Sequence, residues 1–211
     1  MRGRCVLAGI ASTGLVAASL VLAGPASARD TINGTNGPDN LRGTAYSDTI
    51  RGFGGSDRVH AYPGADHIFG GSGGDTLFAG RGDDTIRGRT QGDGLVGRPG
   101  DDTIYGGAGR DNIDGGTGAD VIFGGAMRDG FLFDGRGTDT IHGGPGPDII
   151  SLAKDGTPDT VHCGPGHDVV YGATPMNTVA GDCEELHVGQ PPGCGRLPQR
   201  VLAPLREAAR C

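Results

Sequence analysis

The sequence lacks tryptophan, and aromatic residues make up only 5% of its 211 residues. Hydrophobic residues reach 35%, which is too few for the large core of a conventional helical or α/β enzyme domain. Glutamate is scarce as well, because 22 of the 25 acidic residues are Asp. Such a preference for the shorter carboxylate indicates turns or metal ligation.

Glycine is present in excess, with 44 copies, and proline adds 13. An aperiodic chain of this composition would be disordered, whereas a periodic one would be a repeat protein. The formal net charge of −7 disfavours nucleic acids and anionic membranes as partners and favours cations.

Residues 1–28 have the features of a secretory signal peptide. Arg2 and Arg4 precede an apolar stretch, and Ala26-Ser27-Ala28 forms an A-x-A cleavage site. If it were not cleaved, the same stretch would be a membrane anchor. We expect a secreted, extracellular protein that starts at residue 29 and does not contact the membrane after cleavage.

Aspartate recurs every nine residues from Asp30 to Asp129, and again after a slip of one residue and a slip of two. Two positions after each of these aspartates stands an apolar residue, such as Ile32, Ile104 or Phe131. We expect this residue to point inward from a three-residue strand, and a six-residue turn to follow. Two units then make one coil, and stacked coils pair their strands in parallel. The predicted fold is all-β: a parallel β-roll (a β-solenoid of stacked nine-residue units) over residues 29–171.

Three complete units follow the pattern G-G-x-G-x-D-x-U-x, where U is apolar: Gly70–Phe78, Gly106–Asp114 and Gly115–Phe123. This pattern resembles the hemolysin-type (RTX) calcium-binding repeat. The resemblance implies that Ca²⁺ binds between the turns of units i and i+2, for example between Asp57 and Asp75. The metal ligands that the resemblance implies in this sequence are Asp39, Asp57, Asp66, Asp75, Asp84, Asp102, Asp111, Asp120, Asp139, Asp148 and Asp168.

The residues themselves support the same chemistry. Stacked carboxylates repel one another, and Ca²⁺ suits carboxylate and carbonyl oxygens better than Mg²⁺, which demands a stricter octahedron. Since each unit buries a single apolar side chain, we expect calcium binding to supply folding free energy. The alternative is that the aspartates are turn residues without metal.

Some units depart from the pattern. The fourth position of four units is occupied by a residue other than glycine: Tyr46, Gln91, Met127 and Thr157. We expect each of these side chains to hinder a left-handed turn. For that reason Asp48, Asp93, Asp129 and Asp159 are left out of the ligand set. Insertions near Thr138 and at Lys154–Gly156 are expected to bulge the roll.

Residues 172–211 are expected to form a last degenerate turn and a small, irregular cap held by disulfides. The mature chain keeps four cysteines, Cys163, Cys183, Cys194 and Cys211, which allow three pairings. Proximity favours Cys163–Cys183 together with Cys194–Cys211, and a zinc site is the alternative.

We find no catalytic domain or motif and expect no enzyme; the alternative is a carbohydrate-active lyase or epimerase on a β-solenoid. His142 and His162 are expected to stack on one outer face. Phe69, Tyr105 and Phe123 are expected to share one side, where they either cover strand backbone or form an apolar strip for a partner. Calcium ions are the expected partners, and a cell-surface or carbohydrate partner is left open.

Overall fold

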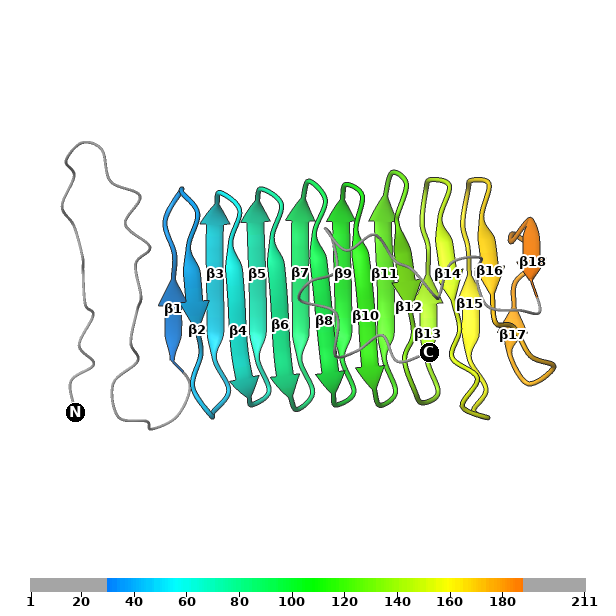
Figure 1. The fold of residues 1–211 in the computed structure, drawn as a ribbon, viewed down its shortest axis with the longest axis horizontal. Helices are drawn as coiled ribbons and strands as arrows, with labels where there is room; N and C mark the ends of the chain where they lie inside the picture. The colour runs from blue at the N-terminus through cyan, green and yellow to red at the C-terminus, as the bar shows by residue number, and fades with distance from the viewer. Residues whose placement is uncertain (1–29, 188–211) are drawn as a thin grey trace, which may run out of the picture.

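The computed structural model describes residues 30–187, which form two parallel sheets of nine strands each (Figure 1). The first sheet has the order β1-β3-β5-β7-β9-β11-β13-β15-β17 and the second β18-β16-β14-β12-β10-β8-β6-β4-β2. In the first sheet the strands are β1 (Thr31–Asn33), β3 (Thr49–Gly54), β5 (His67–Ser72), β7 (Thr85–Thr90), β9 (Thr103–Ala108), β11 (Val121–Ala126), β13 (Thr140–His142), β15 (Thr160–His162) and β17 (Thr178–Val179). In the second they are β2 (Asn40–Arg42), β4 (Arg58–Pro63), β6 (Thr76–Arg81), β8 (Gly94–Pro99), β10 (Asn112–Thr117), β12 (Phe131–Phe133), β14 (Ile149–Ser151), β16 (Val169–Tyr171) and β18 (Glu185–His187).

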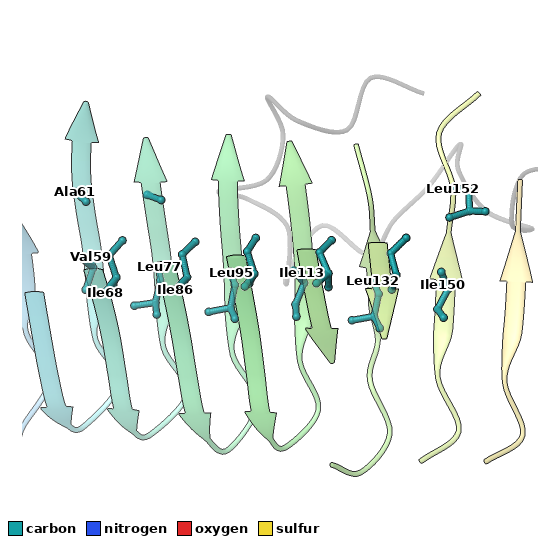
Figure 2. Packing of buried hydrophobic residues seen from close by; sticks show 14 of the residues in the cluster. Val59, Ala61, Ile68, Leu77, Ile86, Leu95, Ile113, Leu132, Ile150 and Leu152 are labelled. Carbon is teal, nitrogen blue, oxygen red and sulfur yellow. The ribbon is translucent and has the colours of Figure 1, made fainter. Parts of the chain in front are cut away.

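The chain winds as a β-solenoid, since each strand pairs with the strand one full coil further along. Ile50 of β3 lies beside Ile68 of β5, a separation of 18 residues, as two nine-residue units predict. Every strand from β2 to β16 contributes one fully or almost fully buried Ile, Leu or Val to a single apolar column between the sheets (Figure 2). The predicted fold class is confirmed.

The strands in the middle of the roll are longer than the repeat predicts. Strands β3 to β11 have six residues rather than three, because pairing continues into the glycine-rich half of the turn. Phe53 pairs with Gly71, and Gly54 pairs with Ser72. The turns are therefore part of the sheets, which holds the aspartate that ends each turn at a fixed height in the stack.

The one-residue insertion lies at Gly130 and not near Thr138 as expected. Asn112 pairs with Phe131 and Ile113 with Leu132, a separation of 19 residues. Leu132 is accordingly the fully buried residue of β12, and the expectation that Phe131 points inward is wrong. The two-residue insertion does lie in the turn that contains Lys154–Gly156. In the strand that follows this turn, Thr160 pairs with Thr140, a separation of 20 residues instead of 18.

The outward residues of the first sheet form a continuous row of stacked side chains. The rings of Tyr105 and Phe123 lie 4.9 Å apart between centroids, and the row continues through His142 to His162, whose rings lie 5.0 Å apart. The guanidinium of Arg87 lies 4.8 Å from the centroid of the Tyr105 ring. The expected stacking on one outer face is confirmed. No helix that could cross a bilayer occurs between residues 30 and 187.

The C-terminal end of the roll is closed by a disulfide between Cys163 and Cys183. This confirms one of the two favoured pairs and rules out the zinc alternative for these two cysteines. Strands β17 and β18 extend both sheets beyond residue 171 by one further coil. The predicted signal peptide, the predicted pair Cys194–Cys211 and the rest of the predicted cap from residue 188 onward lie outside the described residues.

Candidate metal centre

The aspartates of the repeat form two ladders, one along each edge where the two sheets meet through the turns. From Asp30 to Asp148, the backbone N–H of each ladder Asp donates to Oδ1 of the Asp one coil further along, for example from Asp84 to Asp102 at 2.8 Å. On the other edge, Asp75 donates in the same way to Asp93 at 2.7 Å. One oxygen of each carboxylate is thereby used to fix the stacking of the coils.

The second oxygen, Oδ2, is not used in this stacking. Although the side chains are at most 3% exposed, thirteen buried aspartates have an Oδ2 with no hydrogen-bond partner. A buried anionic oxygen without a partner is costly, and native structures seldom keep one. The thirteen are Asp57, Asp66, Asp75, Asp84, Asp93, Asp102, Asp111, Asp120, Asp129, Asp134, Asp139, Asp148 and Asp168.

A backbone carbonyl from the next coil faces each of these oxygens in the regular turns. A Cβ built on Gly97 would collide with both Oδ2 of Asp102 and the carbonyl oxygen of Gly115. Gly88 stands in the same relation to Asp93 and to the carbonyl of Gly106. Carboxylate and carbonyl oxygens that border one small space are the donor set of a hard cation such as Ca²⁺.

Burial raises the pKa of these aspartates well above the usual range. Desolvation is the main cause, and the neighbouring Asp of the ladder adds to it, while the backbone N–H bonded to Oδ1 opposes it. The pKa reaches about 7 for Asp84 and Asp102, and about 8 for Asp93 and Asp120. Without a cation these buried carboxyl groups therefore retain protons near neutral pH, and a bound cation would take the place of those protons.

Ten of the eleven sequence-predicted ligands have an Oδ2 without a hydrogen-bond partner, and Asp39 does not. Oδ2 of Asp39 accepts hydrogen bonds from the backbone N–H and the hydroxyl of Thr35, at 2.6 and 2.9 Å. Thr44 satisfies Asp48 in the same way. At the other end of the roll, Thr174 donates to Oδ1 of Asn177. In the terminal turns a threonine thus donates hydrogen bonds to the side-chain oxygen that has no partner in the other turns.

Two of the four turns with a side chain at the fourth position still adopt the left-handed backbone. Gln91 has φ 73° and Met127 has φ 83°, and Met127 is 65% exposed, so its side chain points to solvent and leaves the turn free. The expected hindrance is therefore wrong at these two positions, and Asp93 and Asp129 keep a free Oδ2. Near the other two, Asp48 is satisfied by Thr44, and Asp159 accepts from Asn177.

Sequence reasoning missed two acidic residues of the ladders. Asp134 takes the first position of its unit once the insertion is placed at Gly130, and counting back from Asp139 through Gly137 and Gly135 would have found it. Glu184 accepts from the backbone N–H of Asp168 at 2.8 Å, as an aspartate would one coil later. It stands only 16 residues on, because the last coil is shorter than a regular one and still pairs Val169 with Glu185.

The fold and these turns define a class: a β-roll whose aspartate turns present paired oxygens for cations along both edges. The family model for the RTX calcium-binding nonapeptide repeat matches the chain in four copies, over residues 33–68, 60–95, 96–130 and 128–153. The chain belongs to this family, and its repeats are calcium-binding repeats folded as a β-roll. No curated protein matches the chain.

Proposed function

We propose that the protein is a secreted structural rod that binds several calcium ions between the turns of neighbouring coils and folds as it binds them. The thirteen unpartnered Oδ2 atoms carry this proposal. Each bound ion would supply the positive charge that the buried carboxylates lack and would link two coils through oxygens of both.

The terminal turns limit where the ions bind. Asp39 and Asp48 already have partners for Oδ2 in Thr35 and Thr44, so we assign the ions to the turns that end between Asp57 and Asp168. This assignment keeps ten of the eleven predicted ligands, adds Asp93, Asp129 and Asp159, and leaves Asp39 out.

Calcium binding and folding are coupled because the sites do not exist without the stacked coils. The carboxylate and the carbonyl that border one space come from different coils, as with Asp102 and Gly115. The unfolded chain cannot bring them together, so the binding free energy becomes folding free energy. A protein of this kind would stay unfolded where calcium is scarce and fold in calcium-rich extracellular fluid.

Secretion is part of the proposal and rests on two features. The first is the signal-like sequence of residues 1–28, and the second is the Cys163–Cys183 disulfide, since structural disulfides form mainly in oxidising compartments. Expression of the full chain in a secreting bacterial host, followed by N-terminal sequencing of protein from the medium, tests this part; we expect the mature chain to start at residue 29.

A titration of residues 29–211 with CaCl₂, followed by far-UV circular dichroism, tests the coupling, with MgCl₂ as the control ion. We expect a cooperative change from coil to β-structure with calcium and none with magnesium. A full β-spectrum in the presence of a chelator, unchanged by calcium, would show that the aspartates are only turn residues and would overturn the proposal.

A further inference from the structure

Three aspartates meet at one turn near the C-terminal end of the roll. Asp134, Asp139 and Asp159 are each at most 2% exposed, and one carboxylate oxygen from each lies within 4.8 Å of the other two. In the described part of the chain, no other three His, Cys, Asp or Glu side chains come together in this way. Oδ2 of Asp134 and Oδ2 of Asp139 both lack a hydrogen-bond partner.

The insertion at Gly130 explains how the third carboxylate arrives there. It moves Asp134 into the first position of its unit. In most other turns this position is glycine, and in two of the regular turns it is alanine, at Ala61 and Ala79. A Cβ at this position points into the space between a ladder carboxylate and the carbonyl of the next coil, as Gly97 shows. The side chain of Asp134 therefore enters the oxygen-lined space itself.

The carboxylates of this trio are held in place by the surrounding backbone. Oδ1 of Asp134 accepts from the backbone N–H of Ala153 at 2.8 Å. The N–H of Asp139 donates to Oδ1 of Asp159 at 3.1 Å. Asn177 donates its side-chain amide to Oδ2 of Asp159 at 2.6 Å. These hydrogen bonds tie both coils to this turn.

We propose that Asp134, Asp139 and Asp159 form a cation site distinct from the regular turns, which binds one calcium ion more tightly than any other turn of the roll. The proposal rests on the calcium binding proposed above and deepens it. Affinity for Ca²⁺ rises with the number of charged ligands and with the rigidity of the site, and this turn brings three carboxylates together where a regular turn adds one per coil. Trivalent lanthanides should bind here in preference to the regular turns for the same reason.

Calcium titrations of residues 29–211 in competition with a chromophoric chelator test the proposal. For the wild-type chain we expect one ion bound about tenfold or more tightly than the remaining ions. Asp134→Gly restores the regular unit, and Asp134→Asn keeps the shape of the side chain without its charge. Both variants should lose the tight ion, keep the weaker ones, and give the wild-type far-UV spectrum in saturating calcium.

Asp83→Asn is the matched control, because it removes one aspartate charge from an exposed position in a turn of the same edge; we expect it to keep the tight ion. Unchanged isotherms for Asp134→Gly and Asp134→Asn would overturn this proposal while leaving calcium-driven folding intact. A wild-type chain that binds no calcium would instead overturn the proposed function. If Asp134→Gly fails to fold, the isotherm of Asp134→Asn decides.

Discussion

The backbone N–H of Asp102 donates to Oδ1 of Asp120 at 2.8 Å, while Oδ2 of that same Asp120 has no partner. One carboxylate therefore serves two purposes: one oxygen fixes the stacking of two coils and the other remains available to a cation. Since the residues are 18 apart and repeat along the roll, coil stacking and the proposed ion binding depend on the same side chains.

Asp102→Asn should weaken calcium-dependent folding. The asparagine keeps Oδ1 as the acceptor for the N–H of Asp84, but it replaces the charged Oδ2 with an amide. We expect the free energy of unfolding in saturating calcium to fall by about 1–3 kcal/mol and the calcium midpoint to rise. Urea unfolding at fixed calcium measures the first and circular dichroism the second.

Asp83→Asn is the control for this substitution too, because it removes an equal charge outside the ladders. Equal losses for Asp83→Asn and Asp102→Asn would mean that net charge, and not the ladder carboxylate, controls folding.

The chelated protein should be more ordered in acid than in mild base. Burial raises the pKa of Asp93 and Asp120 in the roll to about 8, whereas an unfolded Asp titrates near ~3.9. Groups whose folded-state pKa is raised contribute stability that is complete below the unfolded pKa and is lost as the pH rises through the folded one. Without calcium, β-structure should therefore decrease as the pH rises from about 4 to about 8.

Thermal melts at pH 5, 6.5 and 8, in chelator and in saturating calcium, check this dependence. Calcium should abolish the loss at pH 8, because the cation replaces the proton. A chelated protein that gains β-structure as the pH rises would contradict the pKa shifts and their assigned cause.

The position of the insertion at Gly130 predicts unequal effects for two neighbouring residues. Leu132 is fully buried in the core column, whereas Phe131 points outward from β12. Leu132→Ala should cost about 2–5 kcal/mol of unfolding free energy, and Phe131→Ala clearly less. Calorimetry in saturating calcium compares the two variants, and the opposite order would place the insertion near Thr138 instead.

The disulfide between Cys163 and Cys183 should hold the last coil onto the roll. It closes a loop with a sequence separation of 20, for which chain entropy predicts a stabilisation of about 3 kcal/mol. Cys183→Ser should lower the melting temperature in calcium. Peptide mapping without reductant should link Cys163 to Cys183, and a link from Cys163 to Cys194 or Cys211 would disprove the pairing.

Much of this protein could be predicted from its sequence because the repeat is local. Each nine-residue unit contains its own turn glycines, its aspartate and its inward side chain, such as Asp102 followed by Ile104. Identical units can stack only with identical residues above one another, so the period alone predicts two sheets, the apolar column and the aspartate ladders. Ten of the eleven predicted ligands accordingly have an Oδ2 without a hydrogen-bond partner.

Wherever units differ, the contacts between coils decided the outcome. The sequence permits the one-residue slip anywhere between Asp129 and Asp139, and only strand pairing with β10 placed it at Gly130 and brought Asp134 into the ladder. Likewise, β18 pairs with β16, and Glu184 accepts from the N–H of Asp168, although the spacing in the sequence is irregular there. Thr35 donates to Oδ2 of Asp39 in the first turn that the structure describes. The period is a property of each unit, whereas the frame at an insertion and the closure of the two ends depend on which coil lies next to which.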